Sequence, residues 1–267
     1  MAGRHRGGRL IPPTDAPQPY VREDLDARSL HFSSAAIQSR MDIRRPDALA
    51  LDYTRTMMAW PMLRPAARAL ALIGLGGGSI AKFCHRHLAH ASLVAVEIDP
   101  RVIALRDTFR VPPDDARLRV VEADGARFVA ETTERFDVLM VDAFDAAGLP
   151  PALGSQRFYD DCFDALAADG LLVVNLHAGD PQHGTWVERI ARSFGGRVLS
   201  VGDRDGTNSV TFAARGDALA QAGGGALRRP ANLSDAGWKE LRGAFSRVTN
   251  ALVAQGASDA RVSDEPA

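Results

Sequence analysis

The chain has 267 residues, of which 46% are hydrophobic, which suits one full-sized globular domain with short appendages, or at most two small domains. Lys and Arg number 32 against 33 Asp and Glu, giving a formal net charge of −1, so no bulk electrostatic attraction toward nucleic acid or an anionic membrane is implied. No apolar run approaches the roughly 20 residues of a membrane-spanning helix, and the basic start MAGRHRGGRLIPPTDAPQP has no apolar signal segment, so we expect a cytoplasmic protein with no nucleic-acid or membrane partner.

The start of the chain divides into three segments by composition. Residues 1–19 are rich in Arg, Gly and Pro and poor in large apolar residues, which predicts a disordered tail. Residues 20–48 contain the short alternating runs SLHFSS and AAIQSRMD, which indicate a small β-hairpin region or meander. Residues 49–63 are mostly good helix formers, so we expect one helix here, ended by Pro61 or Pro65.

From residue 69 to residue 215, short apolar runs alternate with helical patterns. The runs ALALI, SLVAVEID, LRVVEAD, FDVLMVDAF and LLVVNLH come first, and the closely spaced runs RVLSVGD and SVTFAAR follow. This alternation predicts an α/β fold with a mainly parallel sheet, helices on both faces and an antiparallel edge. We therefore expect a Rossmann-like catalytic domain over 49–215, in which the helix before the fifth strand ends at Gly170.

The end of the chain is predicted to carry one amphipathic helix. Residues 216–232 contain AGGG and are typical of a linker. Within 233–255, apolar residues recur at steps of three and four, which predicts a helix that packs on the domain and is capped by Ser234. Residues 256–267 are polar and predicted to be disordered.

A glycine-rich turn directly follows the first apolar run, with Gly74, Gly76, Gly77 and Gly78. Glycines at a strand-to-helix turn let the backbone approach a ligand because no Cβ intervenes, although a tight turn alone would also use them. The next strand ends at Glu97, about 20 residues further on, where an acid in a nucleotide-binding unit accepts hydrogen bonds from the ribose hydroxyls. The alternative is a solvated charge at a strand end, but the order of strand, loop, helix and acid favours the ribose role.

The third strand ends at Asp124, beside the expected position of an adenine ring. Its carboxylate could accept from the exocyclic amine, or cap the helix over 125–131, and the two roles are compatible. The spacing G-x-G-G-G-S lacks the sixth-position glycine of the dinucleotide motif, and acids at successive strand ends suit a ribose, an amine and a sulfonium cation. The pattern favours an S-adenosyl compound over NAD.

The fourth strand ends with Asp142, and Asp145 lies three residues later. Ligands of open α/β sheets bind outside the carboxyl ends of the strands, so these acids would face the reactive end of the cofactor. Paired carboxylates can hold an organic ammonium group and take its proton. The alternatives are a cap for Asp142 and a solvated loop charge for Asp145. Asn175 and His177 end the fifth strand. Both could approach the site, but we favour strand-end packing as their role.

No metal is expected in the site. Cys84 and Cys162 are isolated, and neither they nor the histidines show a metal-ligand spacing.

The motifs GLGGGS, VEID, EADG and VDAFDAAGLP, in this order, resemble the spermidine synthase (polyamine aminopropyltransferase) family, in particular a divergent bacterial spermidine synthase-like branch. The upstream segments SLHFSSAAIQS and YTRTMMAW resemble its N-terminal hairpin and the helix before its glycine loop, so the resemblance spans roughly Tyr20 to Arg215. It implies a Rossmann-like sheet of the S-adenosylmethionine-dependent methyltransferase type with a small N-terminal β-hairpin region.

The resemblance also implies roles for single residues. Gln38 would touch the cofactor from the hairpin, Glu97 would bind the ribose and Asp124 the adenine. Asp142 would deprotonate the attacking amine, and Asp145 would help to hold a diamine.

Several positions depart from the family pattern. Ser79 replaces an aspartate that holds the ammonium group of the cofactor, and a serine hydroxyl cannot balance that charge. Thr56 and Trp60 stand where the family helix has a Glu-x-x-x-His-like pattern, and Ala146 follows Asp145 where the family has a proline-containing step.

Three functions are therefore compared. The first is aminopropyl transfer from decarboxylated S-adenosylmethionine to a small-molecule amine acceptor. The second is methyl transfer from intact S-adenosylmethionine. Ser79 favours this function, because an aspartate at this position would repel the carboxylate of the intact cofactor. The third is a homologue without turnover, since the fold alone does not fix the reaction. The resemblance also implies a homodimer through the N-terminal strands.

Overall fold

Seven strands form one central sheet in the computed structural model, which describes residues 18–32, 37–222 and 228–263. The strands are β4 (Ala69–Ile73), β5 (Ser92–Glu97), β6 (Leu118–Glu122), β7 (Phe136–Val141), β8 (Leu166–His177), β9 (Val198–Gly202) and β10 (Asn208–Ala214), in the order β6-β5-β4-β7-β8-β10-β9. The strands from β6 to β8 pair in parallel, whereas β10 is antiparallel to both β8 and β9. The predicted parallel sheet with an antiparallel edge is thus confirmed.

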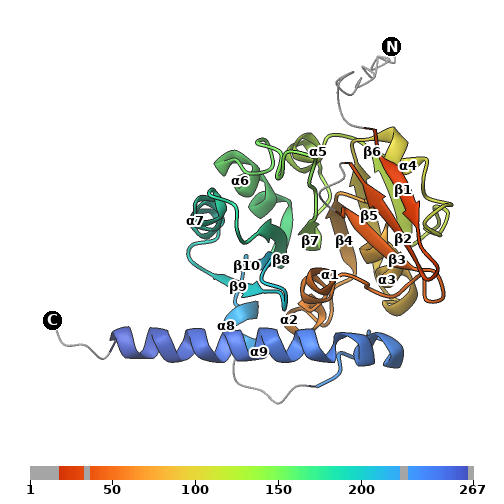
Figure 1. Ribbon diagram of the computed structural model, residues 1–267. Helices are drawn as coiled ribbons and strands as arrows, with labels where there is room; N and C mark the ends of the chain where they lie inside the picture. The colour runs from red at the N-terminus through yellow and green to blue at the C-terminus, as the bar shows by residue number, and fades with distance from the viewer. Residues whose placement is uncertain (1–17, 33–36, 223–227, 264–267) are drawn as a thin grey trace, which may run out of the picture.

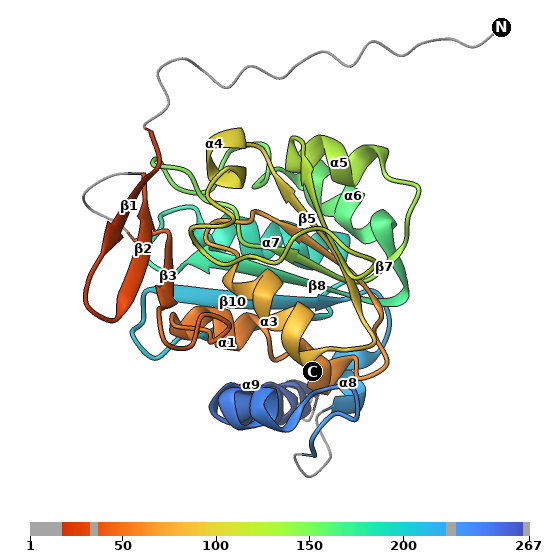
Figure 2. The same cartoon turned by 90° about the vertical axis from the view of Figure 1, so that its right-hand side faces the viewer.

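Helices cover both faces of this sheet (Figures 1 and 2). One face carries α5 (Gly125–Glu131), α6 (Gln156–Ala165) and α7 (His183–Ser193), and the other carries α1 (Asp52–Met57), α3 (Ser79–His87) and the long α9 (Asp235–Ser263). Successive side chains of a strand point to opposite faces. Accordingly Ala71 and Ile73 of β4 belong to the apolar core on the α6 side, and Leu70 and Leu72 to the core on the α9 side.

The N-terminal segment forms a separate antiparallel sheet of three strands, one more than a hairpin. Its strands are β1 (Tyr20–Glu23), β2 (Ala27–His31) and β3 (Ser39–Asp42), paired in that order. The strand β3 contacts α3, the helix that follows the glycine turn. The small sheet therefore lies next to the glycine turn. Residues 1–17 of the expected tail lie outside the described residues.

The helix predicted over 49–63 is present but not continuous, because the segment forms α1 and the short α2 (Trp60–Leu63), with the break just before Pro61, one of the two predicted ends. Met58 and Ala59 separate the two as a turn. Pro61 explains the break, since it has no backbone N–H to continue the hydrogen-bond series of α1, and it lies in the first turn of α2, where that loss is harmless.

The predicted end of α6 at Gly170 is wrong. The helix ends at Ala165, and β8 begins at Leu166 with an irregular pairing to β7. A Cβ on Gly170 would lie 3.0 Å from the carbonyl oxygen of Phe136, so this glycine permits close packing of two strands instead of ending a helix.

The C-terminal segment differs from its predicted boundaries at two places. The short helix α8 (Ala218–Ala222) lies inside the expected linker 216–232, and α9 continues past 255 to Ser263. The predicted cap is present, because the Ser234 hydroxyl accepts from the N–H of Gly237 at 3.1 Å. In the described part of the chain, no helix is both long and apolar enough to cross a membrane.

Candidate active site

A cavity of about 850 Å³ lies at the carboxyl ends of the parallel strands. The strand order reverses at β4, which has β5 on one side and β7 on the other, and ligands of open α/β sheets bind at such a switch point. The wall consists of the glycine turn, the ends of β5 to β8, the start of α1, the segment around β3 and the β9–β10 turn. All of the candidate acids of the sequence analysis line this cavity.

The glycine turn owes its shape to three residues with positive φ, Gly74 (+94°), Gly76 (+51°) and Gly78 (+67°). A Cβ on Gly74 would lie 2.2 Å from the backbone oxygen of Asp142, so this position admits only glycine. Gly77 makes room for Ser39, whose Oγ would lie 2.6 Å from a Cβ there. Gly74 and Gly76 line the cavity, whereas Gly77 and Gly78 do not and instead shape the turn.

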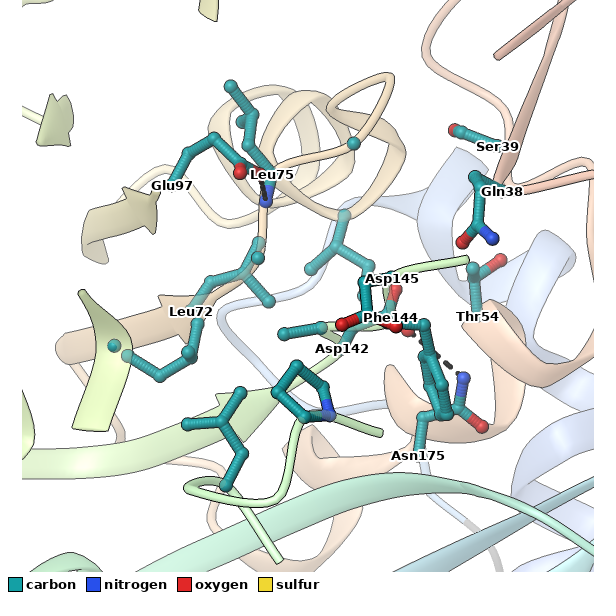
Figure 3. A pocket seen from close by; sticks show the side chains of 18 of the residues that line it. Gln38, Ser39, Thr54, Leu72, Leu75, Glu97, Asp142, Phe144, Asp145 and Asn175 are labelled. Atoms are coloured by element: carbon teal, nitrogen blue, oxygen red, sulfur yellow. Dashed lines mark hydrogen bonds between the residues drawn. The ribbon is translucent and has the colours of Figure 1, made fainter. Parts of the chain in front are cut away.

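Glu97 faces this turn from the end of β5, as Figure 3 shows. Its Oε2 accepts from the backbone N–H of Leu75 at 3.0 Å, and its Oε1 accepts from that of Asp99 at 3.0 Å. Burial raises the pKa of Glu97, and the backbone donors oppose part of that rise. A carboxylate offers about four acceptor sites, more than the backbone donors occupy, so acceptor capacity remains for a hydroxyl group of a ligand.

Asp124 and Asp99 both cap helices at this end of the cavity. The carboxylate of Asp124 accepts from the N–H of Arg127 at 2.8 Å, which confirms the capping role expected for it. Asp99 caps α4 (Pro100–Ile103) and forms an ion pair of 2.7 Å with Arg101. Because Asp124 also lines the cavity, the cap leaves its second oxygen available to a ligand.

Asp142 occupies the other end of the cavity, directly after β7 (Figure 3). Its Oδ1 accepts from the Asn175 amide at 3.0 Å, and its Oδ2 accepts from the Tyr53 hydroxyl at 3.3 Å. Burial raises the pKa of Asp142 to about 6, while the two donors lower it in part. A carboxyl group with this pKa is ionised at neutral pH and is basic enough to take a proton.

Asp145 and Gln38 line the same end of the cavity from different segments of the chain (Figure 3). Asp145 is exposed, and its carboxylate accepts from the N–H of Ala147 at 2.7 Å in a turn closed by Gly148. Gln38 lines the cavity from the start of the segment that leads into β3. The structure thus brings the two acids and the glutamine to one cavity, although they come from distant parts of the sequence.

The structure adds residues that the sequence analysis missed. Tyr53 received no role, and Asn175 was interpreted as strand-end packing, yet both contact Asp142. For Asn175 the favoured packing role is therefore wrong and the alternative, an approach to the site, is what the structure shows. His177 packs edge-on against Phe144, with ring centroids 4.8 Å apart, and also lines the cavity. The position of Asn175 at the end of a buried strand was a usable signal, since strand ends carry ligands in this class of sheet.

The β9–β10 turn supplies further polar side chains to the cavity. Asp203, Asp205, Thr207 and Asn208 line it there. Asp203 also accepts from the N–H of Thr207 at 3.0 Å, which closes the turn. The end of the cavity around Asp142 is therefore strongly acidic.

The four positions that depart from the family pattern differ in their relation to the cavity, which Ala146 lines beside Asp145. Ser79 lines it, and its hydroxyl donates to the backbone oxygen of Arg40 at 3.5 Å. Thr56 and Trp60 are fully buried and do not line it. Thr56 instead accepts from the guanidinium of Arg247 in α9 at 2.7 Å. Among the described residues, no group of three or more His, Cys, Asp or Glu side chains is arranged to hold a metal ion.

Known proteins share both the sequence pattern and the fold. The model of the spermine/spermidine synthase domain matches residues 50–182. A polyamine aminopropyltransferase of Neisseria meningitidis is 37% identical over 201 residues, which covers 74% of this chain and 76% of that protein. Among solved structures, a probable spermidine synthase of Corynebacterium glutamicum superimposes with a TM-score of 0.64 at 17% identity, over 85% of this chain and 91% of that one. A spermidine synthase in complex with the transition-state analogue AdoDATO gives a TM-score of 0.56 at 22% identity, over 84% and 87% of the two chains.

Proposed function

This chain belongs to the spermine/spermidine synthase family, and we propose that it transfers an aminopropyl group from decarboxylated S-adenosylmethionine to an amine acceptor, with Asp142 as the base. The observation that carries the proposal is the placement of Asp142, a carboxylate held by two donors and with a raised pKa, at the opposite end of the cavity from Glu97. One end then suits a nucleoside and the other a reacting amine.

The nucleoside end of the cavity would be formed by Glu97, Asp124 and the backbone around Gly76. The free acceptor sites of Glu97 suit the ribose hydroxyls, and Asp124 suits the exocyclic amine of adenine. The backbone of Gly76 carries no side chain and lies on the cavity wall, so it would allow close approach of the ligand.

The charge of the cavity favours the decarboxylated cofactor over the intact one. Around Asp142, the wall carries the carboxylates of Asp145, Asp203 and Asp205. Arg101 is the single Lys or Arg among the described lining residues, and it is paired with Asp99 at the other end. An ammonium-terminated tail is attracted to this environment, whereas the carboxylate of intact S-adenosylmethionine would meet like charges.

The reaction needs a base, positioning and no covalent enzyme intermediate. The acceptor enters as an ammonium ion, and Asp142 takes one of its protons. The nitrogen lone pair then attacks the aminopropyl carbon beside the sulfonium, and the carbon–sulfur bond breaks. Its electrons neutralise the sulfur, which leaves as a thioether, and the proton on Asp142 passes to solvent.

The acceptor is an amine whose positive charges match the acidic end of the cavity. Asp145 on one side and Asp203 on the other would hold a second ammonium group of a linear diamine. The competing function is methyl transfer from intact S-adenosylmethionine. Ser79 favours it, because this serine replaces the aspartate expected beside the cofactor tail.

Parallel assays with the two cofactors test the proposal. The protein is incubated with decarboxylated S-adenosylmethionine and a panel of linear diamines, and thioether release and aminopropylated amine are measured by mass spectrometry. A matched series uses intact S-adenosylmethionine and monitors adenosylhomocysteine. We expect thioether release only in the first series and only with acceptor present. Adenosylhomocysteine formation without aminopropyl transfer would refute the proposal in favour of a methyltransferase.

A further inference from the structure

Two buried asparagines connect Asp142 to the last strands of the sheet. Asn175 in β8 is 2% exposed and Asn208 at the start of β10 is 8% exposed. The Nδ2 of Asn208 donates to the Oδ1 of Asn175 at 3.0 Å, and the Nδ2 of Asn175 donates to Asp142 at 3.0 Å. The two amides and the carboxylate therefore form one continuous chain of hydrogen bonds.

The direction of this chain depends on which way the Asn175 amide points. An amide has a donor end and an acceptor end of nearly the same shape, so a half-turn exchanges them at little steric cost. Only one orientation suits an ionised carboxylate, namely the NH₂ group toward Asp142. The opposite orientation would place the amide oxygen of Asn175 against the carboxylate and leave two acceptors facing each other.

We propose that Asn208 is a positioning residue for the reaction, because its donated hydrogen bond fixes the Asn175 amide with the NH₂ group toward Asp142. The inference rests on the proposed role of Asp142 as the base. Since Asn208 lies behind Asn175 and acts through it, its effect on Asp142 is indirect.

The backbone of Asn208 is held in place on both sides of the residue. Antiparallel pairing of β8 and β10 places Asn208 opposite His177 and Val210 opposite Asn175, so both asparagines are held by a regular ladder. The backbone oxygen of Asn208 accepts from the N–H of Asp203 at 2.9 Å. The start of β10 is thus fixed to the β9–β10 turn that lines the same cavity.

Other titratable groups share this end of the cavity and contribute to the pH dependence of the reaction. They are Tyr53 and Asp52 of α1, Asp145 after β7, His177 of β8, and Asp203 and Asp205 of the β9–β10 turn. Tyr53 contacts Asp142 directly, and burial raises its pKa well above the usual value, so it stays a neutral donor.

Two substitutions at Asn208 test the proposal. In Asn208→Asp, the new carboxylate can only accept, so the Asn175 amide is expected to turn its NH₂ group toward it and its oxygen toward Asp142. The pKa of Asp142 then rises, and the acid limb of the pH–rate profile moves up by about one unit or more. Asn208→Ala removes the donor without adding charge, and we expect a smaller shift in the same direction. Cofactor affinity should stay at the wild-type value in both variants.

A double-mutant cycle separates an effect through Asn175 from a direct effect of charge. In an Asn175→Ala background, Asn208→Ala should produce no further shift, and Asn208→Asp should keep less than half of its shift. Ser209→Ala is the matched control, because Ser209 is buried on the same strand but does not line the cavity; its profile should be that of the wild type. Equal shifts with and without Asn175, or unchanged profiles for both Asn208 variants, would overturn the proposal.

A second readout needs no turnover. The pKa of Asp142 is also obtained from the pH dependence of the unfolding free energy, by comparing each variant with the same variant carrying Asp142→Asn. If aminopropyl transfer is absent but this pKa moves as expected, the proposed function fails and the positioning role of Asn208 stands. If transfer occurs and this pKa does not move, the positioning role is wrong and the proposed function stands.

Discussion

The carboxylate of Glu97 accepts the backbone N–H of Leu75 at 3.0 Å, across the carboxyl ends of β4 and β5. The acid and the glycine turn are 22 positions apart in sequence, yet they form one surface of the cavity. Their contact fixes the carboxylate at the end of the cavity opposite Asp142 (Figure 3), so cofactor binding and proton transfer are expected to depend on separate residues.

Glu97→Ala tests the binding end. The variant should bind decarboxylated S-adenosylmethionine about 10- to 100-fold more weakly, because hydrogen bonds to a charged group contribute about 1.5–3 kcal/mol. Its rate at saturating cofactor should remain near the wild-type rate. Calorimetry and initial rates measure the two quantities. Glu122→Ala is the control, since Glu122 pairs with Glu97 on the neighbouring strand but lies outside the cavity. Unchanged affinity in Glu97→Ala would contradict the ribose assignment.

Asp142→Asn tests the reacting end, with the opposite expectation. The rate should fall by about 10²- to 10⁴-fold, which is the usual contribution of a positioned general base. The affinity for the cofactor should hardly change, because Asn retains the shape of the side chain. Rates at saturating cofactor and acceptor, together with calorimetry, check both statements. A large loss of affinity with a nearly normal rate would mean that Asp142 binds the cofactor and is not the base.

The same substitution should stabilise the protein at neutral pH. Asp142 has a folded-state pKa of about 6 against an ordinary value of 3.8, so its contribution to stability is present below pH 3.8 and is lost as the pH rises through about 6. The shift is equivalent to at most about 3 kcal/mol. Denaturant unfolding at pH 4 and pH 8 should show Asp142→Asn more stable than the wild type at pH 8 and similar at pH 4. A variant that is less stable at pH 8 would refute the raised pKa.

The nucleoside half of the cavity was predictable from sequence because its parts are local. The turn around Gly74, the strand end at Glu97 and the cap at Asp124 follow from one repeating pattern in which each strand end carries a polar residue. Parallel pairing then brings these strand ends together, so order along the chain was enough to place them.

The reacting half was not predictable in the same way, because its contacts join distant segments. Tyr53 and Asp142 are 89 positions apart, and Asn208 and Asn175 are 33 apart. The contact of Tyr53 with Asp142 and the pairing of β10 with β8 depend on tertiary packing, which periodicity does not encode. Pro61 was named as one of two candidate ends of the helix over 49–63, but the short helix α2 that contains it was missed, because the apolar pattern continues through the proline although the backbone hydrogen bonds cannot.

Gly74→Ala tests whether the turn admits any side chain. The new Cβ would require a φ of +94° and would lie 2.2 Å from the backbone oxygen of Asp142, so we expect a loss of more than about 3 kcal/mol in stability or no soluble protein. Gly202→Ala is the matched control, because nothing lies within 4 Å of its added Cβ, and it should change stability by less than about 0.5 kcal/mol. Denaturant unfolding measures both variants. Equal unfolding free energies for Gly74→Ala and Gly202→Ala would show that the turn can relax to admit a side chain.

Arg247→Gln tests how α9 supports the cavity wall. Arg247 forms an ion pair of 2.9 Å with Asp52, which is 10% exposed at the side chain, and donates to Thr56 at 2.7 Å. Asp52 lines the cavity and also accepts from the backbone N–H of Arg204 in the β9–β10 turn at 3.1 Å. Loss of Arg247 therefore leaves a mostly buried carboxylate with fewer partners.

We expect Arg247→Gln to lower the unfolding free energy by about 1–3 kcal/mol and to raise the KM for the acceptor more than that for the cofactor, because Asp52 joins α1 to the β9–β10 turn at the acceptor end. Arg242→Gln is the control on the same helix, since Arg242 is exposed, and it should leave both quantities unchanged. Denaturant unfolding and steady-state kinetics measure the pair. If the two variants behave alike, the contact between α9 and Asp52 contributes nothing to the cavity, and the long C-terminal helix serves another purpose.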